Sequence, residues 1–485
     1  MPPFQQVYIF SRHVAVGGDK RINILLHLTT RLKNIRLDMV MDEFFHLVSD
    51  LIEASERHEH YRDAECINLI ASEGIKSPAV KEMLSLSMDL ESRYAEGEND
   101  LRGHVKKRYY QGQKYITIIE DCATDLMKKL FKCSWADVRL VSGTHANLAA
   151  FKGLSMATKN NKMVVTPLSC GAHISHDYTG LAGMVLGLVN IDHAYDIEEM
   201  TIDPDRSASI IRAAKPGIIT FGGSLFLFPH PVKELRSVAD EVGAYIVYDA
   251  AHVLGLIAGG MFQDPLREGA DFITSSTHKT FPGPQGGVIL GELKDERMKK
   301  AIERIQYAIF PLSTSNTHLA RLPALGIAAL EMRVFGEALA KQTVKNAKAA
   351  GQYLYENGLK VLGESKGFTE SHQIAVDVRE YGGGKVIAER LEEANIILNR
   401  NILPYDDQNN RENPSGLRIG FQDVTRRGFK EGDIKHLCDL MLQVIKGKRE
   451  PSEVKEDVLA LRREFPRIEY GFKSVKEALD YIKRT

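Results

Sequence analysis

Short runs of apolar, β-rich residues alternate with segments of helical periodicity between about residues 67 and 330. This alternation is typical of βα units that build a largely parallel sheet. In such sheets ligands bind where strands end and loops begin, so polar residues at those ends are candidates for a functional site. The expected strands are VRLVS from Val138, MVVTP from Met163, GIITF from Gly217, AYIVYD from Ala244, DFITSS from Asp271 and GVIL from Gly287.

The pattern changes after Pro323, where a long helical segment runs to Gly358. The segments HQIAVDV, NIILN and LRIGF then alternate with helical stretches and predict a second, smaller α/β domain. Near the other end, residues from Asp42 to His60 are amphipathic and predict a helix. We therefore divide the chain into an N-terminal extension (1–40), a helical arm (41–66), a large domain (67–330) and a small C-terminal domain (331–485).

The first 38 residues precede Met39 and Met41 and are basic and weakly patterned. They are interpreted as an extension or a mis-assigned start. A transit peptide is less favoured, because such peptides usually avoid acidic residues and Asp19 is present.

Composition narrows the class of protein. Hydrophobic residues make up 44% of the chain and charged residues 26%, and 63 basic side chains nearly balance 64 acidic ones. This balance gives no general electrostatic argument for nucleic acid or a membrane surface as partner. The sequence contains no bilayer-length apolar run and no signal-peptide pattern, so we expect a cytoplasmic enzyme. Its five scattered cysteines indicate neither a disulfide framework nor a zinc site.

Two residues at predicted strand ends carry candidate chemistry. Asp249 ends AYIVYD, and Lys279 follows DFITSS 30 residues later, about one strand–helix–strand unit. A lysine amine can condense with the aldehyde of pyridoxal phosphate, and a carboxylate can keep its pyridine nitrogen protonated. Alone, an aspartate in this position more often caps a turn and a loop lysine is more often solvated. Together they predict one pyridoxal-phosphate site.

Further polar positions could complete such a site. SGTHAN, from Ser142 to Asn147, lies where a strand turns into a helix and could bind a phosphate at the helix N-terminus, although such a motif is frequently just a capped βα turn. His173 could stack on a pyridine ring or be structural. Arg418 could bind a carboxylate with two parallel hydrogen bonds, and its alternative is a surface ion pair.

Several long motifs occur in one order between about Ile67 and Lys430. Through them the chain resembles the serine hydroxymethyltransferase family of fold-type-I pyridoxal-phosphate enzymes. The resemblance implies an α/β fold with a large, mostly parallel sheet domain and a smaller C-terminal α/β domain. The motifs are NLIASE (Asn68 to Glu73), RYAEG (Arg93 to Gly97), RYYQG (Arg108 to Gly112), DAAHVLGLIAGG (Asp249 to Gly260), SSTHKTFPGPQGG (Ser275 to Gly287), VKNAK (Val344 to Lys348) and SGLRIGFQDVTRRGF (Ser415 to Phe429).

The resemblance also implies roles for individual residues. Those implied to bind pyridoxal phosphate are Lys279, Asp249, His252, Ser142, Gly143, Thr144, His173, Ser224, Ser276, His278 and Tyr94. Those implied to bind the amino acid are Arg418, Ser72, Glu96 and Tyr110, and the implied catalytic set is Lys279, Glu96, His173, Asp249 and Tyr110. Those implied to contact a pterin are Leu168, Ala172, Ile174 and Asn401.

The activity implied is the interconversion of serine and glycine with tetrahydrofolate or tetrahydromethanopterin as carrier, in one-carbon metabolism and amino-acid biosynthesis. In the family Tyr94 and Glu96 reach across a dimer interface, which implies an obligate homodimer with shared active sites. A threonine aldolase or transaldolase is the alternative. A catalytically silent binding relative is less favoured, because it would not need Lys279, Asp249 and Arg418 together.

The chain departs from the family pattern at four places. Gly74 replaces the usual Asn, about six extra residues lie between Gly97 and Arg108, and Gln285 replaces the usual Arg. The usual glycine-rich FPGGQGG, which contacts the partner's phosphate, is here FPLSTSN from Phe310 to Asn316. These departures resemble archaeal-type or divergent members.

Overall fold

The computed structural model describes residues 43–407 and 412–484, so the predicted extension over residues 1–40 lies outside it. The chain divides into two compact units, one up to Ala64 and one from Glu65 onward. In the first, residues 43–60 form the expected helix, which continues into a π-helical turn, Tyr61–Glu65.

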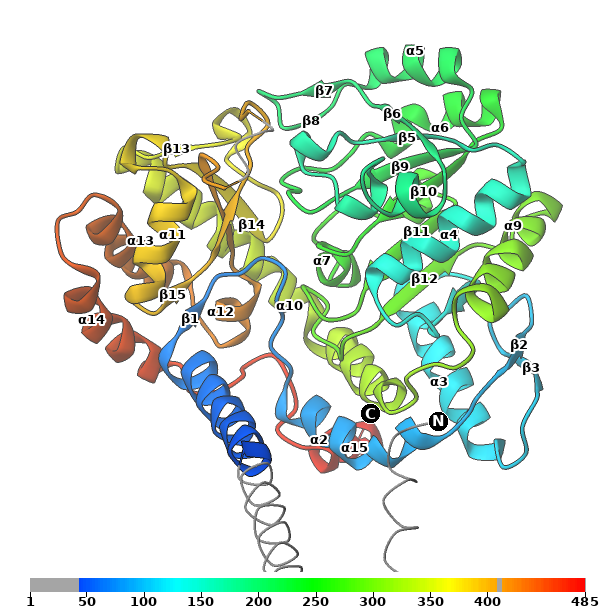
Figure 1. Ribbon diagram of the computed structural model, residues 1–485, viewed down its shortest axis with the longest axis horizontal. Coiled ribbons are helices and arrows are strands. Elements are labelled where there is room, and N and C mark those ends of the chain that lie inside the picture. The colour runs from blue at the N-terminus through cyan, green and yellow to red at the C-terminus, as the bar shows by residue number, and fades with distance from the viewer. Residues whose placement is uncertain (1–42, 408–411, 485) are drawn as a thin grey trace, which may run out of the picture. The chain divides into compact units, whose positions relative to one another are not determined.

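The second unit contains a seven-stranded sheet (Figure 1). All its strand pairs are parallel except the two made by β12. This arrangement confirms the predicted large, mostly parallel sheet. In spatial order the strands are β4 (Trp135–Asp137), β12 (Gly287–Gly291), β11 (Phe272–Ser276), β10 (Tyr245–Asp249), β9 (Ile218–Gly222), β5 (Lys162–Val165) and β6 (Val189–Asp192).

One predicted strand is wrong. The run from Val138 was expected to pair in the sheet, but pairing ends at Asp137. The carboxylate of Asp137 accepts hydrogen bonds from the backbone N–H and the guanidinium of Arg139, which turn the chain out of the ladder. One further bond, from Gly287 N–H to the carbonyl of Leu140, keeps the following segment beside β12.

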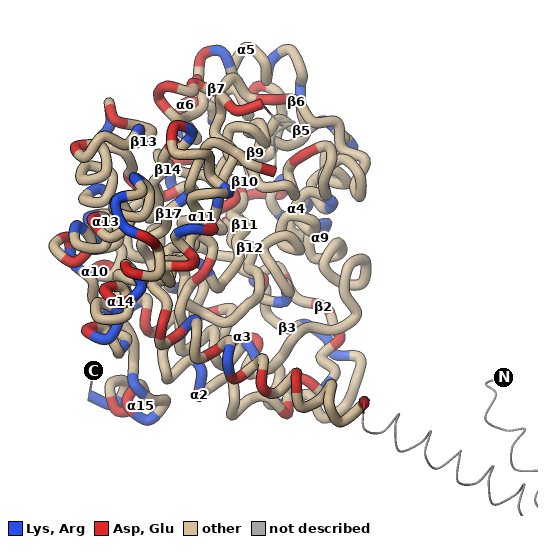
Figure 2. Tube along the Cα trace, turned by 60° about the vertical axis from the view of Figure 1, so that its left-hand side comes forward, with Lys and Arg blue, Asp and Glu red and all other residues tan. Residues whose placement is uncertain are grey.

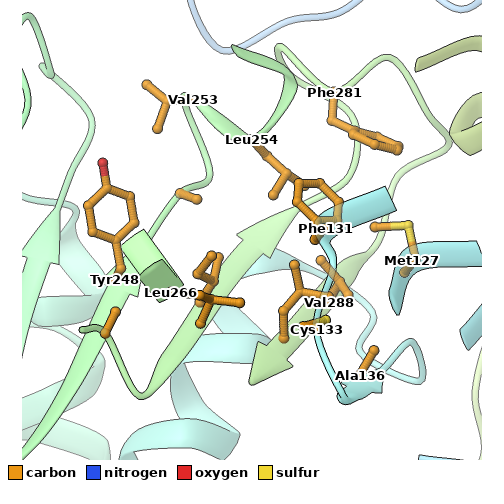
Figure 3. Close-up of a cluster of buried hydrophobic side chains, with 14 of the residues drawn as sticks. Met127, Phe131, Cys133, Ala136, Tyr248, Val253, Leu254, Leu266, Phe281 and Val288 are labelled. Atoms are coloured by element: carbon orange, nitrogen blue, oxygen red, sulfur yellow. The ribbon is translucent and has the colours of Figure 1, made fainter. Parts of the chain in front are cut away.

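Alternating side chains of the strands supply two cores, one on each face of the sheet. Tyr248 of β10 belongs to one core, which Figure 3 shows together with Phe131 and Leu254, and Val247 belongs to the other. The first face is covered by α3 (Lys114–Phe131), α5 (Pro204–Ala214), α6 (Val232–Val242), α7 (Leu254–Ala258), α8 (Pro265–Glu268) and part of α10, and the second by α4 (Gly143–Thr158) and α9 (Glu296–Tyr307).

Helix α10 (Arg321–Glu356) joins two parts of this unit. Its first half packs on the large sheet, and its second half packs against a four-stranded antiparallel sheet. The predicted domain boundary at residue 330 therefore lies inside one continuous helix. The smaller sheet has the order β13 (Lys360–Val361), β14 (Gln373–Asp377), β17 (Gly416–Gly420) and β16 (Asn399–Asn401).

The remaining elements surround these two sheets. The short strands are β1 (Ile67–Asn68) paired with β15 (Ile396–Ile397), β2 (Gly97–Asn99) with β3 (Val105–Arg108), and β7 (Tyr195–Asp196) with β8 (Thr201–Ile202). The other helices are α2 (Pro78–Leu86), α11 (Gly384–Glu393), α12 (Gln422–Arg426), α13 (Glu431–Ile445), α14 (Pro451–Glu464) and α15 (Val475–Arg484). A small apolar cluster joins α15 to α2 through Phe472 and Ala79.

Charge is spread over the molecule in both signs, as expected from a net charge of −1. Figure 2 shows basic and acidic residues interspersed along α13, α14 and α15. Within residues 43–407 and 412–484, no helix combines the length and the apolar character needed to cross a membrane. All five cysteines are free thiols.

Candidate active site

The carboxyl ends of β10 and β11 meet at one cavity of about 180 Å³. The two strands are parallel neighbours in which Asp249 is opposite Thr274, and Lys279 lies three residues beyond β11. The structure therefore brings the lysine and the aspartate into one cavity, as their spacing predicted. The cavity is lined by Ser142, Gly143, Thr144, Asn147, His173, Gly223, Ser224, Asp249, Ala251, His252, Ser276, His278, Lys279 and Gln285.

Asp249 is buried and held by three hydrogen bonds. Its Oδ2 accepts from Asn147 Nδ2 at 2.8 Å and from His176 Nε2 at 2.9 Å, and its Oδ1 accepts from the backbone of Ala251. Burial alone would raise the pKa of Asp249, but these donors, His176 foremost, hold it well below its ordinary range. The carboxylate is therefore ionised and fixed in direction.

Asn147 and His176 are parts of this arrangement that the sequence did not reveal as site residues. Asn147 lies in the quoted SGTHAN run and His176 follows His173 by three residues, but nothing local marks either as a partner of Asp249. Their contact spans 102 residues in one case and 73 in the other. The signal that could have identified them is chemical: a buried carboxylate at Asp249 needs hydrogen-bond donors, and Asn147 and His176 lie in or near motifs already assigned to the site.

The amine of Lys279 is buried near an acidic and a basic side chain, Asp249 and Arg418. Burial lowers the pKa of Lys279 to about 8, an effect that Asp249 opposes and Arg418 reinforces. Compared with an ordinary lysine, the fraction present as neutral amine near pH 7 rises by about two to three orders of magnitude. A neutral amine is the form that can attack a carbonyl carbon.

One end of the cavity is suited to an anion. Ser142 caps α4 by accepting from the His145 N–H at 3.0 Å, so the N-terminus of the helix opens toward the cavity. A Cβ added to Gly143 would lie 2.9 Å from the backbone nitrogen of Ser276, so glycine is needed for this close approach. Ser142, Thr144 and Ser276, which all carry hydroxyl groups, are among the residues that line the cavity.

Three histidines line the cavity in neutral form. Burial lowers the pKa of His173 and of His278 to about 4, and that of His252 well below its usual range. His173 Nδ1 is bonded to the hydroxyl of Ser175 at 2.7 Å. The buried Nδ1 atoms of His252 and His278 have no hydrogen-bond partner among the described residues, and a bound polar ligand could supply one.

Arg418, on β17, is buried with 8% of its surface exposed. Its Nε donates to Asn399 Oδ1 at 3.1 Å and its Nη1 to the carbonyl of Ser224 at 2.9 Å. No carboxylate in the described part of the chain forms an ion pair with it, and burial lowers the pKa of Arg418 to about 10. The alternative of a surface ion pair is therefore wrong, and a bound anion could supply the missing counter-charge.

A second cavity of about 290 Å³ adjoins the first, since Ser224 lines both. It contains three of the four residues implied to contact a pterin, namely Leu168, Ala172 and Asn401. The fourth, Ile174, is 46% exposed and does not line it.

Six predicted site residues are absent from the lining of both cavities: Arg418 and Ile174, already described, and Ser72, Tyr94, Glu96 and Tyr110. Tyr94 and Tyr110 are about half exposed, with ring centroids 5.3 Å apart, and Glu96 lies on the same segment. Ser72 lies in the turn after β1, next to Ala71. A single chain thus does not bring Tyr94, Glu96 and Tyr110 to Lys279.

The segment from Phe310 to Asn316 makes side-chain hydrogen bonds that glycines could not make. Ser313 Oγ lies 2.7 Å from His145 Nε2, on the first turn of α4. Asn316 accepts from the N–H of Ala95 at 2.9 Å and donates to the carbonyl of Arg93 at 2.8 Å, on either side of Tyr94. The segment therefore connects the start of α4 with the residues around Tyr94.

Two other departures also lie near Lys279. Gln285 lines the cavity, in the place of the usual arginine. A Cβ on Gly74 would lie 2.0 Å from the carbonyl oxygen of Lys279, so no side chain fits at that position in this backbone. Among the described residues, no group of His, Cys, Asp and Glu is arranged to hold a metal ion.

The parallel sheet with an aspartate and a lysine at adjacent strand ends defines the class of fold-type-I pyridoxal-phosphate enzymes. Consistent with this class, the fold matches the crystal structure of L-threonine transaldolase from Pseudomonas fluorescens with a TM-score of 0.77 and 25% identity, covering 92% of this chain and 98% of that one.

A family model described as serine hydroxymethyltransferase matches residues 47–441. The serine hydroxymethyltransferase of Pyrococcus horikoshii is 50% identical over 419 residues, which cover 86% of this chain and 95% of that protein. That of Staphylothermus marinus is 46% identical over 426 residues, covering 88% and 93%. The chain belongs to the serine hydroxymethyltransferase family.

Proposed function

We propose that this protein is a pyridoxal-phosphate-dependent hydroxymethyltransferase that interconverts serine and glycine with a reduced pterin as carrier. The observation that carries the proposal is the cavity in which Lys279 and an ionised Asp249 lie together, near a buried Arg418 that has no carboxylate partner among residues 43–407 and 412–484. Family membership supports the same activity.

The residues present fit the cofactor. Lys279 would bind its aldehyde carbon, Asp249 its ring nitrogen and His173 one face of the ring. The phosphate would lie at the start of α4, against Ser142, Gly143, Thr144, Ser276 and His278, and the ring hydroxyl near His252 and Ser224. When bound, pyridoxal phosphate supplies a ring that accepts the electrons of a bond broken at the amino-acid α-carbon.

Side chains of the protein keep the ring nitrogen protonated, bind the substrate and accept its proton. Asp249 holds a proton on the pyridine nitrogen, because His176 and Asn147 keep the carboxylate ionised. Arg418 and Ser72 bind the amino-acid carboxylate and so fix the rotation of the substrate about its Cα–N bond. Glu96, supplied by a second copy of the chain together with Tyr94 and Tyr110, takes the proton of the serine hydroxyl.

The carrier site is the second cavity. Its position beside Ser224, and its lining by Leu168, Ala172 and Asn401, favour a carrier over direct release of an aldehyde. The fold match to a transaldolase makes aldolase or transaldolase chemistry the alternative to test.

The test measures glycine formation from serine with each pterin, and cleavage of threonine without one. We expect carrier-dependent turnover, and borohydride reduction should leave the cofactor on Lys279. Asn401→Ala should lower the affinity for the pterin carrier without altering the affinity for glycine. Asn357→Ala, at the end of α10 and outside both cavities, is the matched control. Rapid threonine cleavage with no response to either pterin would make this protein an aldolase.

Sharing of the active site is tested by mixing two inactive variants. Lys279→Ala and Glu96→Gln homodimers should each lack activity. Random exchange of their subunits should restore about a quarter of wild-type turnover, because half of the dimers then contain one intact site. No recovery after demonstrated exchange would place Glu96 in its own chain's site.

A further inference from the structure

The turn that carries Ser72 is held almost entirely through its backbone. We call residues 69–75 the carboxylate turn. The side chain of Gln422 donates to the carbonyls of Ile70 at 2.7 Å and Glu73 at 2.6 Å, and the N–H of Gly420 donates to the carbonyl of Leu69 at 2.8 Å. The position of the turn is therefore set by β17 and the start of α12.

The carbonyl of Ala71, next to Ser72, is bonded by a residue without an assigned role. His372 is fully buried just before β14, and its Nε2 lies 3.0 Å from that carbonyl. A carbonyl oxygen only accepts, so Nε2 carries the hydrogen. Burial lowers the pKa of His372 to about 3, so the ring is neutral and its Nδ1 accepts from the hydroxyl of Ser371 at 3.0 Å.

This bond lies directly beside the predicted carboxylate-binding arginine. A Cβ added to Gly420 would lie 2.4 Å from the Cα of Ala71, so Ala71 packs on the face of β17 that Gly420 leaves open. Arg418 is two residues earlier on the same strand and therefore on the same face. Where Ala71 lies thus decides how Ser72 is presented to Arg418.

The same ring also contacts the large-sheet side of the site. The rings of His372 and His252 are stacked, with centroids 5.7 Å apart and an interplanar angle of 26°. His252 lines the cavity that contains Lys279. His372 therefore touches the carboxylate turn at one edge and a cavity residue on one face.

We propose that His372 is a positioning residue for the amino-acid carboxylate, which holds Ala71, and through it Ser72, against β17 beside Arg418. The inference rests on the proposed function, because it assumes that Arg418 and Ser72 bind an amino acid. It adds a residue that touches no substrate and acts through one hydrogen bond.

Two substitutions separate the hydrogen bond from the ring. His372→Phe keeps a flat ring beside His252 but cannot donate to Ala71, whereas His372→Gln keeps an N–H donor and loses the ring. We expect His372→Phe to weaken glycine binding by about 10-fold, the effect of losing one hydrogen bond, with cofactor affinity unchanged. His372→Gln should stay within about threefold of wild type.

The readouts are the dissociation constant of glycine by calorimetry on the cofactor-loaded protein, and hydrogen exchange of the amides of residues 69–75 without amino acid. Exchange there should accelerate in His372→Phe and not in His372→Gln. His193→Phe is the matched control, since His193 is equally buried, stacks on Phe221 and lines neither cavity. It should change neither readout.

Gly420→Ala provides an independent route if His372→Phe does not fold, because its Cβ displaces Ala71 while His372 remains. It should weaken glycine binding to a similar extent. Unchanged glycine binding in either variant, or equal losses in His372→Phe and His372→Gln, would overturn the positioning role. Wild-type protein that binds neither glycine nor serine would contradict the proposed function itself, and the inference with it.

Discussion

Arg418 and Arg426 lie eight residues apart, on β17 and α12, and both are buried, yet their surroundings differ. Arg426 pairs with Glu331 of α10 at 2.5 Å and donates to the carbonyl of Ile75 at 2.8 Å. Within the described part of the chain, the partners of Arg418 are an amide oxygen and a backbone carbonyl. One buried charge is neutralised inside the protein, and the other is not.

This difference in partners distinguishes an arginine that stabilises the fold, Arg426, from one that we expect to bind a ligand, Arg418. Burying a charge without a counter-charge is costly, so such a group is retained where a ligand repays the cost. The absence of an ion pair does not by itself identify a ligand-binding arginine. Among the described residues Arg321 also has no carboxylate partner, but it donates to the carbonyls of Val138 and Leu140. Neither arginine lines either of the two cavities, but Arg418 donates to the carbonyl of Ser224, which lines both of them.

The largest effect that we expect is on the free energy of unfolding, when the ion-paired Arg426 is replaced. Arg426→Met should leave Glu331 buried without its cation and lower the free energy of unfolding by about 3–5 kcal/mol. Arg418→Met, in the absence of amino acid, should change it little or increase it, because no internal charge is left unpaired. Urea unfolding of both variants measures the contrast, and equal destabilisation would remove the distinction between the two sites.

Asp249 is an intermediate case, because its buried charge has hydrogen-bond partners within the protein and also lines the cavity. Asp249→Asn keeps the shape of the side chain but removes its charge, so we expect turnover to fall by about 100-fold or more with the cofactor retained. Measuring kcat together with cofactor absorbance separates the two effects. Asp205→Asn, at an exposed position on α5, is the matched control. Full activity in Asp249→Asn would exclude this role.

Arg418→Lys should have the next largest effect. A lysine retains the charge but replaces a planar pair of donors with a point charge, so glycine and serine affinity should fall by about 10- to 100-fold. Calorimetric titration measures it, with cofactor affinity as the internal control. If amino-acid affinity is unchanged, the carboxylate binds elsewhere.

Much of the fold follows from local sequence pattern. Five of the six expected strands of the large sheet form, since each is a short β-rich run with apolar residues that a sheet covered on both faces buries. The sixth was misplaced because Asp137 binds Arg139 and ends the ladder. That interaction depends on how two polar side chains fold back on each other, which hydrophobic pattern does not encode.

The site divides in the same way. Lys279 and Asp249 could be placed together because parallel neighbours end at one edge of a sheet. His176 and His372 could not, because their partners, Asp249 and Ala71, are distant in sequence and are met only after packing. The sequence also could not predict that Arg418 is buried without a carboxylate partner among the described residues, because this depends on every group packed around it.

The smallest expected effect links Arg418 to the chemistry of Lys279. The positive charge of Arg418 contributes to lowering the pKa of Lys279 to about 8, so Arg418→Met should raise that pKa by less than one unit. Because only the neutral amine reacts, the rate of pyridoxal-phosphate capture by the cofactor-free protein should rise with pH and level off above about 8. In Arg418→Met the whole profile should move to higher pH, so capture near pH 7 slows by a few-fold while the plateau is unchanged. Stopped-flow absorbance across this pH range measures both curves. Arg426→Lys, which keeps its charge and is not among the groups acting on Lys279, should leave the midpoint in place. A midpoint near 10 in the wild type would show that burial does not depress the lysine, and an unmoved midpoint in Arg418→Met would show that the two charges do not interact.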